Sequence, residues 1–291
     1  MTTAGELADR FEAHRAHLRA VAYRMLGSLS ESDDAVQEAW LRFSRTDTSG
    51  VDNLRGWLTT VVARVSVDVL RTRAARREDP LDTHVPDPIL RAIGRVDDGP
   101  ETDAIAADTV GLALLIVLEQ LEPAERLAFV LHDVFGMSFD EISPIVDRST
   151  VATRQLASRA RRRVRGRALA VPADLREQRR VVDAFLAAVR QGDFDALVTL
   201  LDPDIVLRAD GGPVKGMSRL VRGASAVVAQ AATFSKVVLT NQIVLVNGHV
   251  GVVTRLPDGR VFSVVGFTVV DGKVVEMDIL ADPDRLARLD L

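Results

Sequence analysis

Apolar side chains recur at three- and four-residue spacing over residues 6–77, a pattern that predicts helices. Phe11 and Leu18 belong to the first run, which residues 27–32 interrupt. The pattern restarts over residues 33–43, and residues 57–77 carry a broad apolar face. The sequence therefore predicts a bundle of three helices in this part of the chain.

A second helical segment is predicted over residues 104–168. Ser138 and Glu141 have the spacing of a capping box, in which each side chain satisfies a backbone donor of the other residue. Ser149 is a good N-cap for a further helix that begins directly after it. Pro144 lies between these two caps and removes a backbone donor, so the helix after Ser138 is either kinked or short.

Beyond residue 172 the period of the apolar residues changes. Residues 175–201 predict two helices divided at Gly192, and residues 223–234 predict a third. β-Branched runs separated by Asp-Gly and Asn-Gly turns predict strands at residues 205–209, 237–245, 250–256, 261–270 and 274–280. This order predicts an α+β domain with an antiparallel sheet.

Residues 79–104 separate the helical segments and are rich in proline and acids. Eight acidic residues stand against two arginines over residues 78–103, which indicates a linker. The expected organisation is multidomain, with two all-α domains before the α+β domain. Its boundaries are residues 1–78, a linker at 79–104, then 105–168 and 173–291.

The amino-acid composition limits the kinds of chemical site that the chain can form. The 291 residues contain no cysteine, which excludes disulfides and thiolate metal sites and suits a cytoplasmic protein. The five histidines lack the spacing of a zinc site, and neither a metal nor another cofactor is implied. The start of the chain has no apolar core of a signal peptide, and no segment has the composition of a transmembrane helix.

Net charge is −4, yet the arginines are clustered. Seven arginines and no acid lie within residues 154–167, and a second cluster lies within residues 71–77. Local potential governs attraction to phosphates, so the two clusters predict two contacts with a polyanion.

The segment at residues 138–165 has the pattern of a helix-turn-helix, whose second helix fits the major groove of DNA. Candidates for reading bases are Ser149, Thr150, Thr153 and Arg154, and candidates for phosphate contacts are Arg159, Arg161, Arg162, Arg163 and Arg165. The alternative is a helical hairpin with a solvated basic face.

Residues 1–168 resemble a sigma factor of the extracytoplasmic-function (ECF) group of the sigma-70 family. Residues 31–42 resemble region 2.2, which docks on the clamp helices of the β′ subunit of RNA polymerase. Polymerase binding is thereby implied for Asp33, Asp34, Gln37, Glu38 and Trp40. From their chemistry alone, the acids equally fit a solvated face and Trp40 fits the core.

Residues 56–64 and 68–71 resemble regions 2.3 and 2.4, which open and read the minus-ten element. Contacts with that element are implied for Trp57, Arg64, Asp68, Arg71 and Arg73. The family often has asparagine after the arginine that corresponds to Arg64, where this chain has Val65. Residues 123–129 and the helix-turn-helix resemble region 4, which reads the minus-thirty-five element and binds the β flap.

Residues 175–291 resemble the SnoaL-like, or NTF2-like, cone fold that a subgroup of these sigma factors carries. The subgroup shares a proline-containing linker patch and two patches in the extension, found here as His84, Pro86 and Pro88, then Asp210, Gly211, Gly212 and Lys215, then Asp282, Pro283 and Asp284. The resemblance implies that the extension regulates the sigma factor in cis, without a separate anti-sigma protein. The acidic linker would suit basic polymerase channels, although a plain spacer has the same composition.

The function expected is therefore promoter-specific transcription initiation with core RNA polymerase and promoter DNA as partners, at no membrane and without catalysis. One alternative is a ligand-sensing helix-turn-helix regulator that does not bind polymerase. Another is a catalytic cone domain with His249 as base and Asp204, Asp210 or Asp278 as its carboxylate.

Overall fold

The computed structural model describes residues 4–48, 50–76, 82–93, 111–167, 173–234 and 239–289. The chain forms two compact units. The helical unit comprises Met1–Asp79, Asp97–Asp108 and Val117–Arg167, and the sheet unit comprises Pro80–Val96, Thr109–Ile116 and Ala168–Leu291. The linker patch and part of the second predicted helical segment thus belong to the sheet unit, and α5 (Leu112–Glu119) contributes to both units.

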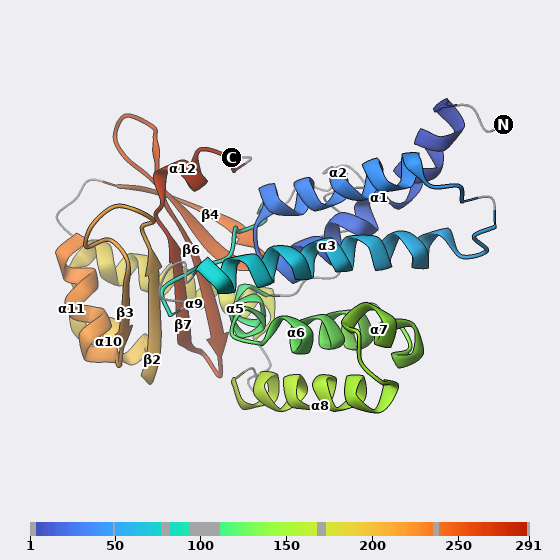
Figure 1. Ribbon diagram of the computed structural model, residues 1–291. Helices are drawn as coiled ribbons and strands as arrows, with labels where there is room; N and C mark the ends of the chain where they lie inside the picture. The colour runs from blue at the N-terminus through green and yellow to red at the C-terminus, as the bar shows by residue number, and fades with distance from the viewer. Residues whose placement is uncertain are drawn as a thin grey trace. The chain divides into compact units, whose positions relative to one another are not determined.

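Three helices open the helical unit, as predicted, and lie side by side in Figure 1. They are α1 (Ala4–Leu26), α2 (Leu29–Arg45) and α3 (Leu54–Arg76). Phe11, Leu18 and Leu58 are fully buried among them. Gly27 has φ +69°, a left-handed conformation that lets the chain reverse between α1 and α2.

The second half of the helical unit contains α6 (Pro123–Phe129), η1 (Val130–Val134), α7 (Phe139–Val146) and α8 (Thr150–Arg167). Residues 123–134 do not form one regular α-helix, because η1 has π-helical bonding. The capping box of Ser138 and Glu141 is confirmed. Pro144 leaves the Asp140 carbonyl without a backbone donor, and the Ser143 hydroxyl donates to that carbonyl at 3.2 Å instead.

The sheet unit contains α9 (Leu175–Gln191), α10 (Phe194–Leu200), α11 (Ala224–Phe234) and α12 (Pro283–Leu286). Its strands are β1 (Leu90–Ala92), β2 (Leu201–Asp210), β3 (Arg219–Arg222), β4 (Thr240–Val246), β5 (His249–Arg255), β6 (Val261–Val270) and β7 (Lys273–Leu280). The sheet order is β1-β4-β5-β6-β7-β2-β3.

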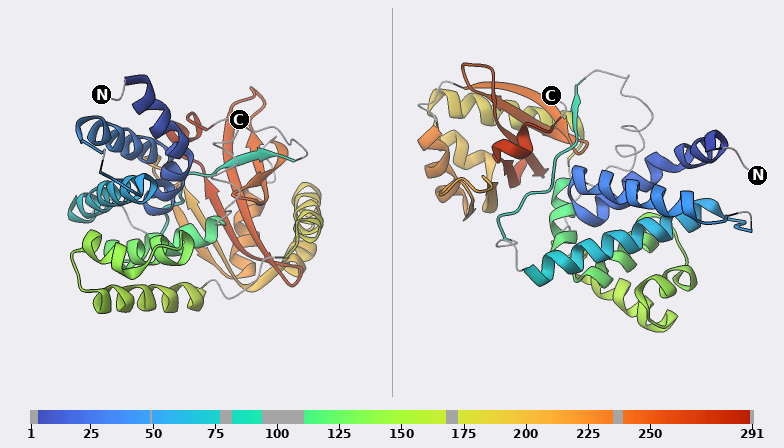
Figure 2. Two further views of the ribbon diagram at one scale, coloured as in Figure 1. Left: turned by 90° about the vertical axis from the view of Figure 1, so that its right-hand side faces the viewer. Right: turned by 45° about the horizontal axis from the view of Figure 1, so that its top comes forward.

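The prediction of an antiparallel sheet is wrong at one pair, since β2 and β7 run parallel. The segment between them contains β3, α11 and the strands β4–β6, and such a long connection brings β7 back beside β2 in the same direction. The sequence also did not predict β1, a three-residue strand of the linker that lies at the sheet edge next to β4 (Figure 2).

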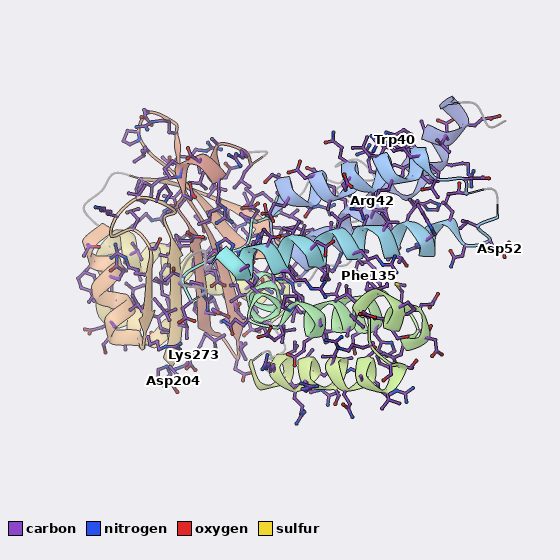
Figure 3. The ribbon with its side chains drawn as sticks, viewed as in Figure 1. Trp40, Arg42, Asp52, Phe135, Asp204 and Lys273 are labelled. Carbon is purple, nitrogen blue, oxygen red and sulfur yellow. The ribbon has the colours of Figure 1, made fainter. Side chains whose placement is uncertain are left out.

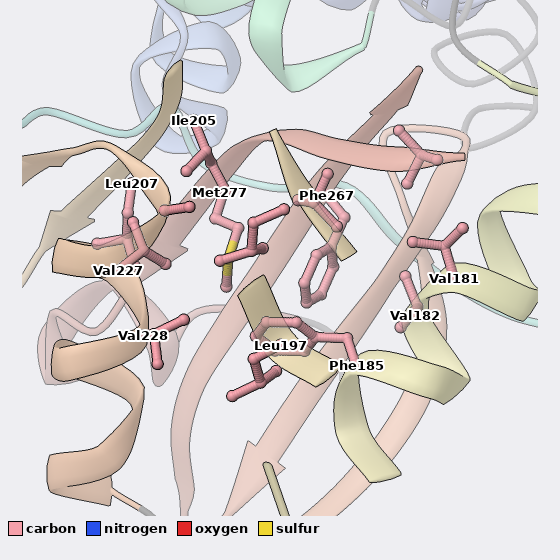
Figure 4. Close-up of a cluster of buried hydrophobic side chains, with 14 of the residues drawn as sticks. Val181, Val182, Phe185, Leu197, Ile205, Leu207, Val227, Val228, Phe267 and Met277 are labelled. Atoms are coloured by element: carbon pink, nitrogen blue, oxygen red, sulfur yellow. The ribbon is translucent and has the colours of Figure 1, made fainter. Parts of the chain in front are cut away.

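The apolar core of this unit lies between α9–α11 and one face of the sheet. Phe185, Val227, Phe267 and Met277 are buried in it (Figure 4). Side chains alternate along β2, so Leu207 faces this core whereas Arg208 and Asp210 face the opposite side of the sheet. The opposite face therefore carries the buried polar groups. No helix within the described ranges is both long and apolar enough to cross a membrane.

Candidate nucleic-acid interface and linker clasp

One face of α8 is exposed along its length, at the spacing of a helical stripe. Its members are Val151, Arg154, Gln155, Ser158, Arg159 and Arg162. Ser149 caps the helix, since its Oγ accepts a hydrogen bond from the Ala152 amide at 3.2 Å. The arginines on this face give it a positive charge, which attracts the phosphates of a nucleic acid.

Two of the predicted base-reading residues are held inside the helical unit. Thr153 is fully buried, and its hydroxyl donates to the Ser149 carbonyl at 3.0 Å, so its side chain does not lie on the exposed face of α8. Packing of α8 on α6 places it there. Thr150 is half-buried and donates to Asp140 Oδ1 at 3.0 Å.

Arg154 is exposed and ordered by an aromatic stack. Its guanidinium lies 5.4 Å from the centre of the Phe139 ring, which stacks on His132 at 3.9 Å between centroids. A cation held over an aromatic face loses little further freedom on binding. The stack therefore presents Arg154 in a fixed direction.

The other predicted phosphate contacts differ in their present partners. Arg163 lies 2.9 Å and Arg159 lies 3.7 Å from the buried Glu125, and Arg161 lies 2.5 Å from Asp133. Arg161 and Arg163 thereby hold α8 against α6 and η1, whereas Arg162 and Arg165 are exposed.

Four of the five residues predicted at the minus-ten element follow one line of α3: Trp57, Arg64, Asp68 and Arg71. Trp57 is half-buried, with its ring 6.2 Å from that of Phe43, and the other three are exposed. Arg64 donates to the Pro144 carbonyl at 3.4 Å. Val65 is buried, so this departure from the family pattern faces the core.

Arg73 does not share that line. It is half-buried, pairs with Glu31 of α2 and donates to the Leu26 carbonyl of α1 at 3.1 Å. These contacts tie three helices together, so its place in the structure is that of a packing residue.

The predicted polymerase-binding residues lie on α2. Asp33, Asp34 and Gln37 are exposed on one face with Leu41, and Asp33 pairs with Arg19 at 2.6 Å. Glu38 beside them is half-exposed and pairs with Arg42 at 2.8 Å. Trp40, labelled in Figure 3, is half-buried and meets the Phe11 ring edge-on at 5.2 Å. The acids form the accessible surface, and Trp40 packs beneath it.

The three patches predicted for internal regulation meet on the polar face of the sheet unit. Asp210 Oδ2 accepts hydrogen bonds from the Val85 amide at 3.0 Å and from Arg285 Nη1 at 2.7 Å. His84 Nδ1 lies 3.2 Å from the same oxygen. We call the set of contacts between the linker residues 82–92 and the rest of the sheet unit the clasp.

Arg285 is the centre of the clasp. Its Nε donates to Asp87 Oδ1 at 2.7 Å, and its Nη2 donates to the Val85 carbonyl at 2.6 Å. Burial alone would raise the pKa of Asp210, but the hydrogen bonds that it accepts and the adjacent guanidinium outweigh burial and lower that pKa to about 2. The carboxylate is therefore ionised in the clasp.

The clasp continues along β1. Asn247 Oδ1 accepts from the Ile89 amide at 3.0 Å, and the Asn247 amide donates to the Ile89 carbonyl at 2.9 Å. Arg208 Nε donates to the Asp82 carbonyl at 3.1 Å while its Nη1 contacts Glu276 and Asp278 of β7. Burial and the Glu276 charge raise the pKa of Asp278, against the effect of Arg208.

Sequence reasoning named the clasp patches but missed their two organising side chains, Arg285 and Asn247. Arg285 directly follows the third patch, and its charge is opposite to that of Asp87 in the linker, which was the available signal. Pro86 and Pro88 are buried in the linker patch, and Asp282 caps α12, which Pro283 and the exposed Asp284 begin. Lys215 is exposed on the turn that follows Gly212.

Glycine is required at position 212, where the second and third patches meet. Its φ is +56°, and a Cβ there would lie 2.2 Å from Asp282 Oδ2. Gly212→Ala is expected to destabilise the sheet unit by about 2 kcal/mol or more, measured by urea unfolding. Gly216→Ala is the matched control, because Gly216 has φ +79° with no atom within 4 Å of the added Cβ, and should cost about 1 kcal/mol. Equal costs for the two variants would contradict the clash.

Three of the four residues considered for catalysis, Asp210, Asp278 and His249, are engaged by other groups. Asp204, labelled in Figure 3, is exposed on β2, and Asp210 ends the same strand. His249 Nδ1 lies 3.2 Å from the Asn247 carbonyl, and burial lowers the pKa of the ring. Asp210 and Asp278 are engaged by arginines on the face opposite to the apolar core.

Three family models match the chain: Sigma-70 region 2 at residues 10–76, Sigma-70 region 4 at residues 112–164, and a SnoaL-like domain at residues 182–277. The ECF RNA polymerase sigma factor SigJ of Mycobacterium tuberculosis is 40% identical over 290 residues, which cover 95% of this chain and 92% of that protein. The probable ECF RNA polymerase sigma factor SigI of the same species is 38% identical over 200 residues, which cover 69% of this chain and 68% of that protein.

Similarity extends to a solved structure. The crystal structure of M. tuberculosis SigJ matches with a TM-score of 0.76 and 35% sequence identity, over 98% of this chain and 99% of that chain. The match includes both the helical and the sheet units.

Proposed function

This chain belongs to the ECF RNA polymerase sigma factors, which direct promoter-specific transcription initiation, and we propose that its clasp restrains that activity in cis. In this proposal the acidic face of α2 docks on the β′ clamp helices of core polymerase. The exposed line of α3 contacts the minus-ten element. Region 4 contacts the β flap, and α8 enters the major groove of the minus-thirty-five element.

The observation that carries the proposal is the reach of the chain. The two promoter elements lie about 25 base pairs apart, which is about 85 Å at 3.4 Å for each pair. A free segment over residues 77–111 spans up to about 120 Å, which is sufficient. With the clasp closed, only residues 77–81 connect α3 to the sheet unit, and they span about 17 Å at most.

The other end of the linker is held by the same sheet. A Cβ added at Gly111 would lie 2.8 Å from His249 Cε1, and one added at Gly266 would lie 3.1 Å from Leu112 Cδ2, so the start of α5 rests on β5 and β6. Both ends of the linker are therefore held by the same sheet. In this proposal, opening of the clasp frees the linker so that α3 and α8 can reach both elements together.

A reversible crosslink tests this proposal, because the chain has no cysteine of its own. Ala92 and Val244 are directly paired between β1 and β4, at a separation that suits a disulfide. The oxidised Ala92→Cys/Val244→Cys variant should lose transcription from a cognate promoter in vitro, and reduction should restore it.

Thr240→Cys/Arg255→Cys is the matched control, since it crosslinks β4 to β5 inside the sheet and leaves β1 free. It should be active in both redox states. Full activity of the locked Ala92→Cys/Val244→Cys variant would overturn the proposal and assign the clasp a structural role.

The proposal includes no separate anti-sigma protein and no catalysis by the SnoaL-like domain. Support for the second point comes from Asp210 and Asp278, which arginines hold on the polar face, and from the apolar side chains that fill the opposite side. Replacement of Asp204, the exposed candidate carboxylate, by asparagine should then leave transcription unchanged.

A further inference from the structure

Val151 is the most exposed large apolar side chain among the described residues, with 64% of its surface accessible. It lies in the first turn of α8, which is otherwise polar on its outer face. Arg154 and Gln155 follow it at helical spacing on that face, and both are exposed. A single exposed valine is common on protein surfaces, so its position is what gives it meaning.

Val151 is the apolar side chain available for an external contact at this end of α8, because its neighbours are engaged within the protein. Thr150 is engaged by Asp140, and Thr153 is buried with its hydroxyl bonded to Ser149. Valine also has a lower helix propensity than alanine, so the local structure gains nothing from it. We therefore expect the Val151 side chain to contact a partner molecule.

We propose that Val151 contacts the C5-methyl group of a thymine in the minus-thirty-five element and selects for that base. The inference rests on the proposed placement of α8 in the major groove. Thymine alone of the four bases presents a methyl group there, and an apolar side chain is its natural partner. Phosphate contact is excluded for Val151 because its side chain has no hydrogen-bond donor.

Gln155, on the same face of α8, provides a second candidate base contact for comparison with Val151. It lies four residues further along α8, about 6 Å along the helix axis, so it meets a base within about two steps of the thymine. A glutamine amide pairs in two places with adenine. The two side chains therefore read different base pairs.

The test uses polymerase holoenzyme with the full chain and a promoter selected by that holoenzyme from random duplexes. Each thymine of the upstream element is replaced in turn by deoxyuridine, which lacks only the methyl group. At one position, uracil should weaken binding of the unchanged protein about fourfold, the effect expected for one buried methyl group.

Val151→Ala should bind the thymine duplex about fourfold more weakly, and uracil at that position should then have no further effect. The variant is expected to fold, because the position is exposed and alanine favours the helix. Val198→Ala on α10 is the matched control, since Val198 is 44% exposed and lies outside the proposed interface; it should bind as the unchanged protein does.

Two outcomes overturn the inference in distinguishable ways. If Gln155→Ala alters base preference but Val151→Ala weakens thymine and uracil duplexes alike, α8 reads DNA and Val151 does not read the methyl group. If neither variant, nor Arg154→Ala, changes binding to the upstream element, the proposed role of α8 itself fails.

Discussion

Replacement of Asp34 by arginine is expected to weaken binding of the chain to core RNA polymerase about 100-fold. Asp34 is exposed on α2 beside Asp33 and Gln37. We propose that this acidic face meets a basic surface of the clamp helices. Charge reversal sets like charges against each other, which costs several kcal/mol where the groups approach closely. The measurement is equilibrium binding of the purified full chain to immobilised core polymerase at fixed salt.

Asp34 is the sharper choice of the two acids, because Asp33 pairs with Arg19 at 2.6 Å and its reversal would also disturb α1. Asp183→Arg is the control, since this exposed acid lies on α9 of the sheet unit. Equal affinity of Asp34→Arg and Asp183→Arg for polymerase would remove α2 from the interface and leave family membership intact.

Local signals explain why the helical unit was predictable. The apolar period gave α1–α3, and the capping box at Ser138 gave the start of α7. The buried face of α8 was harder to predict, because threonine is polar but Thr153 packs inward. The stripe of Thr153, Ala157 and Ala160 at spacings of four and three marks that buried face, and small side chains there were the unused signal.

The topology of the sheet unit could not be predicted from local sequence patterns. Parallel pairing of β2 with β7 joins residues about 70 positions apart in the chain, and no turn motif encodes it. β1 has three residues and follows Pro88, so neither its length nor its composition favours a strand. Its partner is the free edge of β4, which exists only once the sheet has formed.

Replacement of Arg285 by methionine is expected to lower the free energy of unfolding of the sheet unit by about 3 kcal/mol. The guanidinium is largely buried and is shared by Asp87 and Asp210, whose carboxylates are also buried. Methionine keeps much of the aliphatic volume but leaves both carboxylates without their cation. Arg260→Met is the control, because Arg260 is exposed and pairs with Asp258 nearby in sequence.

Each unit can be followed separately in this experiment. Both tryptophans, Trp40 and Trp57, belong to the helical unit, so their fluorescence should not respond to Arg285→Met. Hydrogen exchange of the β1 and β4 amides reports the clasp and should accelerate about 100-fold for a loss of about 3 kcal/mol. Unchanged exchange in β1 would show that Arg285 does not hold the linker.

Acid should open the clasp by the same physics. The pKa of Asp210 is about 2 in the folded chain and lies below its ordinary value, so its carboxylate stabilises the fold above about pH 4 and loses that contribution as pH falls towards 2. The contribution is about 2 kcal/mol. Protection of the Val85 amide should therefore decline over this range, and Asp210→Asn should show a weaker clasp whose protection varies less with pH. An equally steep decline in Asp210→Asn would assign the acid sensitivity to another group.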